Sequence, residues 1–172
     1  MDVLSGWSAR FRLIDSRVYI RRMPQSLSNV VIHLIFSTKD REPLIGPDLR
    51  TRLYAYLAAV ARNAGCEAYR IGGVSDHVHL AIRLSRTLSI ANLVEALKTS
   101  SSKWVKTEAP GLKAFSWQRG YGCFSIGHSD LDALCAYIDS QEEHHKKRTF
   151  QDEYRSYLAQ YDVQYDEAYV WD

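Results

Sequence analysis

The stretch DHVHLAIRL, residues 76–84, opens an apolar run with two histidines that are separated by one residue. Strand side chains alternate between the two faces of a sheet with a period of two. A strand over this run therefore directs His77 and His79 to one face. Four apolar side chains would point to the core on the other face: Val78, Leu80, Ile82 and Leu84. Two imidazoles side by side on a rigid strand form half of a metal site.

The sequence around this stretch predicts alternating strands and helices. Runs rich in β-branched and aromatic residues predict strands over 29–37, 66–71 and 78–84, and the glycine-bent run 115–127 predicts one or two more. Helical spacing of apolar residues predicts helices that begin at Pro47, Ser89 and Ser129, and a fourth over 150–161.

This order of elements favours the α+β class, with a ferredoxin-like (split βαβ) antiparallel sheet. We expect the helices on one face and a C-terminal helical tail. The first and third strands would be central, so that the histidines lie mid-sheet. Their face would point away from the helices unless the third helix folds across it. The apolar chain end, Tyr169 to Asp172, should dock on the body.

Length and composition suit one domain over 23–172. We expect residues 1–22, which hold five arginines and no continuous apolar core, to be a loosely structured basic N-terminal extension or a start-site artefact. Three cysteines without metal or redox spacing indicate a cytoplasmic protein. No apolar run approaches the roughly 18 residues of a membrane span, so we expect no membrane partner.

The net charge of +2 is unevenly distributed along the chain. Residues 142–172 carry a net charge of −4, whereas residues 83–119 hold seven lysines and arginines against two glutamates. A local basic patch of this kind fits a polyanion such as nucleic acid. A solvated helix face has the same composition, so charge alone leaves both interpretations open.

A second candidate feature lies sixty residues after the histidines, in Tyr137 and Gln141. Helix positions four apart share a face. A divalent ion held by His77, His79 and Gln141, with the Tyr137 hydroxyl beside it, would suit attack on a phosphodiester. Tyrosine ionises only near pH 10, about three units above neutrality, so it needs such an ion to stabilise the charge of the transition state. Mixed nitrogen and oxygen ligands suit Mg²⁺ or Mn²⁺.

A histidine pair by itself is weak evidence, because other protein classes share it and core or surface pairs are common. Histidine-triad hydrolases need a third histidine where this chain has Ala81. Two-histidine phosphoesterases need two His-x-Ser/Thr motifs, and this sequence has neither. A zinc finger needs partner ligands at fixed spacing, and the adjacent His144 and His145 would diverge by about 100° on a helix.

Several blocks of this sequence resemble the single-tyrosine HUH transposases of small bacterial insertion sequences, the TnpA-type enzymes. The resemblance runs from Met23 to Asp172, and residues 1–22 lie outside the family pattern. The blocks that carry it are PQSL (24–27), HLIFSTK (33–39), GGVSDHVH (72–79), SSSKW (100–104), WQRGYG (117–122), YI (137–138), QEEHH (141–145) and YVWD (169–172).

The resemblance implies a metal-dependent transposase that cleaves and rejoins single-stranded DNA and recognises hairpins at the element ends. Tyr137 would attack the phosphorus and leave a covalent 5′-phosphotyrosine. The resemblance also implies a homodimer in which the tyrosine helix of one subunit completes the histidine pair of the other. The alternative is a non-catalytic or host-adopted protein of the same fold that binds single-stranded or hairpin nucleic acid.

Candidate DNA contacts follow from residue type. Phosphates would be contacted by Lys39, Arg41, Lys98, Lys103, Lys106 and Arg119. Bases would stack on Trp117 or Tyr121. Trp117 fits the core equally well.

Overall fold

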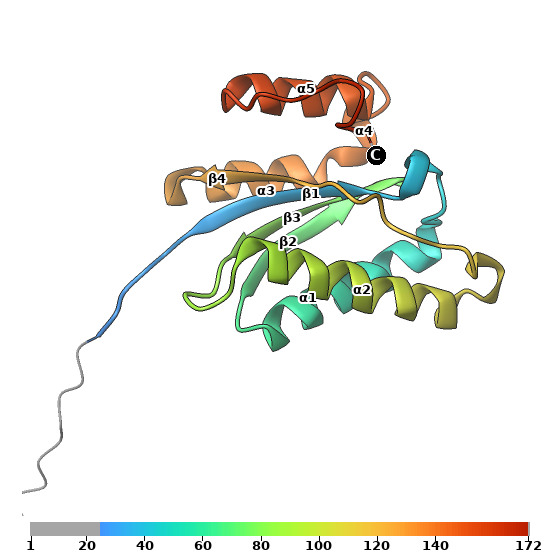
Figure 1. Ribbon diagram of the computed structural model, residues 1–172, viewed down its shortest axis with the longest axis horizontal. Coiled ribbons are helices and arrows are strands. Elements are labelled where there is room, and N and C mark those ends of the chain that lie inside the picture. The colour runs from blue at the N-terminus through green and yellow to red at the C-terminus, as the bar shows by residue number, and fades with distance from the viewer. Residues whose placement is uncertain (1–24, 172) are drawn as a thin grey trace, which may run out of the picture.

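A four-stranded antiparallel sheet with the strand order β2-β3-β1-β4 forms the centre of the molecule (Figure 1). The computed structural model describes residues 25–171, so the expectation for residues 1–22 lies outside the described residues. The strands are β1 (Val31–Ser37), β2 (Glu67–Gly73), β3 (His77–Arg83) and β4 (Gly122–Ile126). The predicted ferredoxin-like α+β fold is confirmed, with β1 and β3 paired on both sides.

Helices follow the strands in the predicted order. The described residues contain α1 (Pro47–Asn63), α2 (Ile90–Glu108), α3 (Leu131–Asp139), α4 (Gln141–His144) and α5 (Phe150–Gln160), with short 3-10 helices η1 (Lys39–Arg41), η2 (Pro110–Leu112) and η3 (His128–Asp130). Ser89 caps α2 as predicted, because its side chain accepts a hydrogen bond from the Asn92 backbone N–H. No helix between residues 25 and 171 has the length and apolar character needed to cross a membrane.

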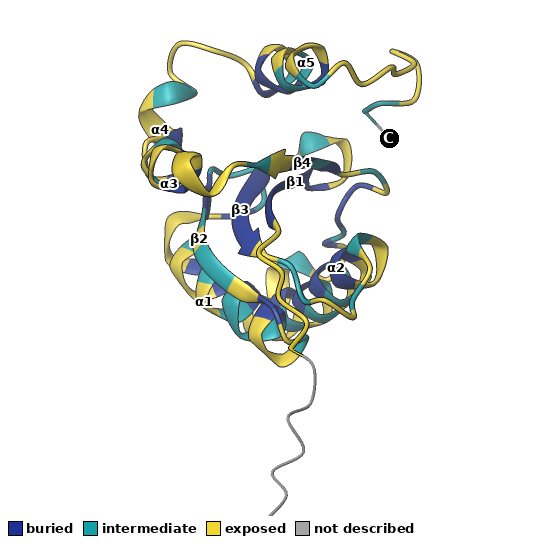
Figure 2. Cartoon of the chain, turned by 90° about the vertical axis from the view of Figure 1, so that its left-hand side faces the viewer, coloured by how far each residue is buried: buried dark blue, intermediate teal, exposed yellow. Residues whose placement is uncertain are grey.

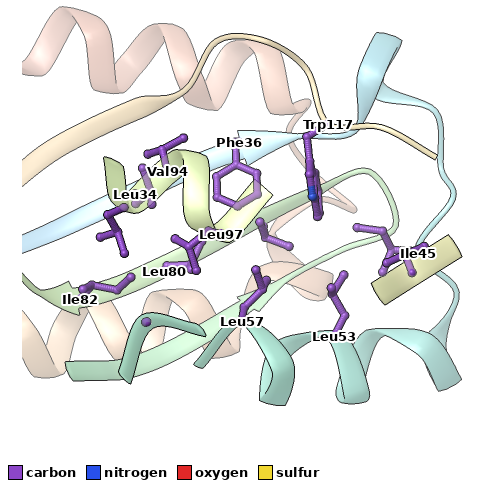
Figure 3. Close-up of a cluster of buried hydrophobic side chains, with 14 of the residues drawn as sticks. Leu34, Phe36, Ile45, Leu53, Leu57, Leu80, Ile82, Val94, Leu97 and Trp117 are labelled. Carbon is purple, nitrogen blue, oxygen red and sulfur yellow. The ribbon is translucent and has the colours of Figure 1, made fainter. Parts of the chain in front are cut away.

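Alternation along β1 divides its side chains between two apolar layers. Leu34 and Phe36 pack with Leu80 and Leu97 against α1 and α2 (Figure 3). Ile35 points to the opposite face, where it packs with residues of α5. Helices therefore cover both faces of the sheet (Figures 1 and 2), so the expectation of helices on one face is wrong, because α3 folds across the histidine face and α5 packs on the same side. Each fully buried aliphatic side chain of these layers contributes about 1.5–3 kcal/mol.

Gly72 of β2 lets α3 approach the sheet closely. A Cβ atom at this position would lie 2.6 Å from Ile138 Cγ2 and 2.8 Å from the Ile138 carbonyl oxygen, both of them on α3. Any larger residue would hold the helix away from the strand. The glycine therefore sets the distance between α3 and the sheet, and with it the position of Tyr137, the residue before Ile138.

The predicted docking of the chain end is confirmed for two of its residues, whereas Tyr169 is 74 % exposed and Asp172 lies outside the described residues. Val170 and Trp171 pack on the apolar cluster that α5 forms with the sheet. The Trp171 ring lies under two guanidinium groups, with centroid distances of 5.0 Å to Arg155 Cζ and 5.7 Å to Arg41 Cζ. Cation–π contacts of this kind add about 0.5–1 kcal/mol at exposed sites.

Candidate active site

The histidine pair lies on β3, in the interior of the sheet. His77 and His79 are both fully buried. The ring of His77 packs 4.5 Å from that of Phe150 in α5, and the ring of His79 lies 5.9 Å from that of Tyr137 in α3. Val78, between them, belongs to the opposite core. The prediction that the two histidines share one face is therefore confirmed, and that face lies under the C-terminal helices.

Each of the two histidines has a defined partner for Nδ1, its outer ring nitrogen, whereas Nε2 is the inner one. His77 Nδ1 lies 2.7 Å from Asp76 Oδ1, and His79 Nδ1 lies 2.9 Å from Nε2 of His33 in β1. The Nε2 atoms of His77 and His79 are buried and have no hydrogen-bond partner among the described residues. Burial lowers the pKa of His79 well below its ordinary value, which keeps that ring neutral. Neutral imidazoles with a fixed outer nitrogen and a free inner nitrogen are suited to binding a metal ion.

The predicted nucleophile, Tyr137, lies beside this pair in the same chain. Its ring stands nearly perpendicular to the rings of His79 and His33, with centroid distances of 5.9 and 6.2 Å. Its hydroxyl oxygen is buried, and no described residue forms a hydrogen bond with it. The ring of Tyr157, in α5, stands 6.2 Å away. The tyrosine and the histidines therefore meet within one subunit.

Gln141 reaches the site by a different route from the predicted one. The helix that holds Tyr137 ends at Asp139, and Gln141 begins the separate helix α4. Ser140, with φ −90° and ψ 7°, makes the break. The predicted continuous helix from Tyr137 to Gln141 is therefore interrupted at this residue. Gln141 is nevertheless 1 % exposed and lies in the cluster around the histidines.

Two residues that the sequence did not predict complete this cluster, His145 after α4 and Glu153 in α5. One donor atom from each of His77, His79, His145 and Glu153 lies within 4.8 Å of the others, so these residues could hold a metal ion. Glu153 is 2 % exposed, and burial raises its pKa to about 8, assisted by the charge of Asp76. A buried carboxylate of this kind calls for a nearby cation.

Two of the candidate DNA contacts have structural roles in the protein. Lys98 Nζ donates to the carbonyl oxygens of residues 118, 119 and 120 at 2.9, 3.2 and 2.6 Å, so its ammonium group holds this loop, and the phosphate contact of this residue stays a prediction. Burial also lowers its pKa to about 8. Trp117 is 7 % exposed, and its indole N–H donates to Ser101 Oγ at 2.9 Å. Of the two interpretations offered for Trp117, the core position is therefore the correct one.

The other candidate DNA contacts remain accessible. Tyr121 is 37 % exposed, and Arg41 is half-buried beside Trp171. The exposed cations are Lys39, Lys103, Lys106 and Arg119. A surface depression reaches Asp76 and His145. Three cationic side chains border it: Arg41, which is one of the candidate DNA contacts, and two others, Lys146 and Arg148. A phosphate chain could approach the histidine cluster along this border.

Comparison with known proteins identifies the family of this chain. The family model described as "Transposase IS200 like" matches residues 26–141. The curated ISDra2 transposase TnpA of Deinococcus radiodurans is 26 % identical over 116 residues, which cover 64 % of this chain and 83 % of that protein.

Two solved structures have a similar fold. A crystal structure of a provisionally assigned transposase from Deinococcus radiodurans aligns with a TM-score of 0.58 and 23 % identity, and the match covers 71 % of this chain and 98 % of that one. The structure of a REP-associated tyrosine transposase bound to a REP hairpin aligns with a TM-score of 0.52 and 17 % identity, over 72 % of each chain. At these identities the two structures establish the fold alone.

Proposed function

This chain belongs to the IS200-like transposase family, and on that premise we propose that it cleaves and rejoins single-stranded DNA through a covalent bond to Tyr137. Membership of the family makes the protein a DNA transposase. The chemical steps, the ion and the form of DNA are our proposal. The observation that carries it is the meeting of the Tyr137 ring with the buried histidine pair.

Tyr137 would act as the nucleophile. Its hydroxyl oxygen would bond to the phosphorus as the bond from phosphorus to the 3′-oxygen breaks. The phenolic proton leaves, and the products are a 5′-phosphotyrosine and a free 3′-hydroxyl. Since one phosphodiester replaces another, a different 3′-hydroxyl can reverse the step and join new ends without ATP. The buried hydroxyl without a protein partner supports this role, because its hydrogen bond is left for a substrate.

His77 and His79 would hold a divalent ion, Mg²⁺ or Mn²⁺, with Gln141 as the predicted third ligand. Two observations support the fit: the inner nitrogens of the histidines are buried without partners, and the Gln141 amide lies in the same cluster. When bound, the ion would withdraw charge from the scissile phosphate. The protein's own part is to fix the imidazoles through Asp76 and His33 and to exclude water with α5.

The DNA would be single-stranded with hairpins at the element ends. One relative of the same fold is bound to a REP hairpin, which supports a hairpin partner. The exposed Lys39, Arg119 and Tyr121 would contact phosphates and bases outside the site. A homodimer remains part of the proposal. Tyr137 reaches the histidines within one chain, so the site need not be shared between subunits. Light scattering would measure whether the protein is a dimer in solution.

The proposal is tested by incubating the protein with labelled single-stranded hairpin DNA from the flanks of its gene and Mg²⁺ or Mn²⁺. A denaturing gel then separates covalent adducts. Tyr137→Phe should abolish the adduct, His77→Ala should abolish cleavage, and Tyr165→Phe, at a 43 % exposed tyrosine, is the matched control. An adduct that persists in Tyr137→Phe would place the nucleophile elsewhere. Cleavage without any divalent ion would refute the metal dependence.

Hairpin binding with no adduct from the unaltered protein would favour the alternative, a non-catalytic or host-adopted nucleic-acid-binding protein. Mapping the element ends around the gene would separate a mobile element from a host-adopted relative.

A further inference from the structure

Three imidazoles around the candidate site share one orientation. His77 and His145 each turn Nδ1 toward an oxygen, Asp76 Oδ1 at 2.7 Å and the Arg148 carbonyl at 3.1 Å. A ring nitrogen in such a contact carries the hydrogen, since an oxygen of this kind only accepts. In a neutral imidazole the other nitrogen, Nε2, then carries a lone pair. His79 turns Nδ1 toward Nε2 of His33, and where that nitrogen accepts the hydrogen bond, His79 Nε2 carries a lone pair as well. One donor atom from each of the three histidines then faces a common centre.

The lone pair of His145 Nε2 faces two oxygen atoms. Gln141 Oε1 lies 2.9 Å from it, and Glu153 Oε2 lies 3.0 Å from it. The Gln141 amide cannot be turned around to relieve this contact, because its nitrogen donates to Glu153 Oε1 at 3.3 Å. Electron pairs directed at one another repel. A proton on Glu153 would remove this repulsion, and so would a cation that the four donor atoms, all within 4.8 Å of one another, can reach together. Glu153 Oε2 has no hydrogen-bond donor among the described residues.

We propose that Glu153 is a direct ligand of the divalent ion, together with the Nε2 atoms of His77, His79 and His145. This inference rests on the proposed metal dependence. It adds His145 and Glu153 to the predicted histidine pair and makes Gln141 a positioning residue in place of the third ligand. The Gln141 amide contacts both His145 and Glu153 and so holds them in place. The two added ligands lie beyond the segment that matches the family model, residues 26–141, so the C-terminal part of this chain supplies them.

The donor set also narrows the choice of ion. Mg²⁺ is bound mainly through oxygen atoms and water, whereas imidazole suits transition metals. Three imidazoles and one carboxylate therefore favour Mn²⁺, or a later divalent transition metal, over Mg²⁺. The carboxylate partly neutralises the ion, and the ion provides the cation that a buried carboxylate needs.

Metal binding is measured without DNA, so that its outcome does not depend on strand cleavage. The full chain, first stripped of metal, is titrated with Mn²⁺ while electron paramagnetic resonance records the free ion. We expect one tight site per chain and at least tenfold weaker binding of Mg²⁺ in competition. Glu153→Gln should weaken Mn²⁺ binding by about 10- to 100-fold or more. The control is Glu143→Gln, which alters an exposed glutamate that pairs with Lys146 and should leave the affinity unchanged.

Thermal unfolding separates a ligand from a simple ion pair between Glu153 and His145. Without metal, Glu153→Gln should unfold at the same temperature as the unaltered protein or at a higher one, and Mn²⁺ should stabilise the unaltered protein more strongly. Equal Mn²⁺ affinity of the two proteins would overturn the inference, and a less stable metal-free variant would then identify the ion pair. An unaltered protein that binds no Mn²⁺ would overturn it too. Formation of the DNA adduct, assayed separately, would still decide the proposed function.

Discussion

Replacing Gly72 with alanine should uncouple Tyr137 from the histidines without altering any group that takes part in the chemistry. The added Cβ would lie 2.6 Å from Ile138 Cγ2 and 2.8 Å from the Ile138 carbonyl oxygen, whereas ordinary contacts lie at 3.4–4 Å. Rotation of the Ile138 side chain can relieve the first contact. The second involves backbone, so α3 must retreat from β2.

The size of the retreat sets the expected effect. Restoring ordinary contacts requires a shift of about 1 Å in a close-packed interior. A displacement of this size in a reacting group costs about 100-fold in rate, and overpacking costs about 1–3 kcal/mol of stability. Gly72→Ala should therefore form the covalent DNA adduct about 100-fold more slowly in single-turnover assays, while the protein remains folded at 25 °C.

The matched control is Gly111→Ala, because no atom lies within 4 Å of a Cβ at that position. It should form the adduct at the rate of the unaltered protein. An adduct rate for Gly72→Ala within about threefold of that rate, less than 1 kcal/mol in the barrier, would refute the reasoning. It would mean that the contact between α3 and β2 does not set the position of the phenol.

Three further predictions concern single side chains. In metal-free protein, burial raises the pKa of Glu153 from its ordinary 4.5 to about 8, so the native state binds this proton more tightly than the unfolded chain does. Stability should then fall as the pH rises from about 4.5 to about 8, by up to about 5 kcal/mol; urea unfolding at pH 5 and pH 8 should show a smaller fall in Glu153→Gln. Lys98→Met should lower the free energy of unfolding by about 1–3 kcal/mol because three loop carbonyls lose their donor. A reduced salt dependence of DNA binding in that variant would support the predicted phosphate contact. His33→Ala should weaken Mn²⁺ binding by about 10- to 100-fold, since His79 loses the partner of its outer nitrogen, and calorimetric titration that finds equal affinity would contradict this.

The sheet and the histidine pair were predictable from the sequence because their signals are local. The period of two in residues 76–84 is a property of any extended backbone, so it predicts both the strand and the faces of its side chains. Ser89 signals a helix start through its own hydroxyl. Most of the correct predictions therefore concern features that are determined by residues close together in the sequence.

The rest of the site depends on contacts between distant segments. The break at Ser140 has no strong local signal, since neither proline nor glycine marks it. Lys98 and Trp117 have residue types that suit DNA, and only the fold shows that a loop and Ser101 occupy their polar atoms. The buried position of Glu153 could have been predicted from the sequence. It lies on the apolar stripe of α5, beside Phe150 and Tyr154, and a carboxylate at such a position indicates a buried role.

The burial of the Tyr137 hydroxyl affects the stability of the phosphotyrosine bond that this residue would form. Its hydroxyl is buried, and two surface depressions that Tyr137 lines are both also lined by Tyr157 of α5. A phosphotyrosine made there would be kept from bulk water, which otherwise competes with an incoming DNA end. The same residues on a sheet open to solvent would cut strands and lose them to hydrolysis. A site covered by α5 would keep the cleaved strand bound to the protein until it is rejoined. That property distinguishes an enzyme that moves DNA from a nuclease that only degrades it.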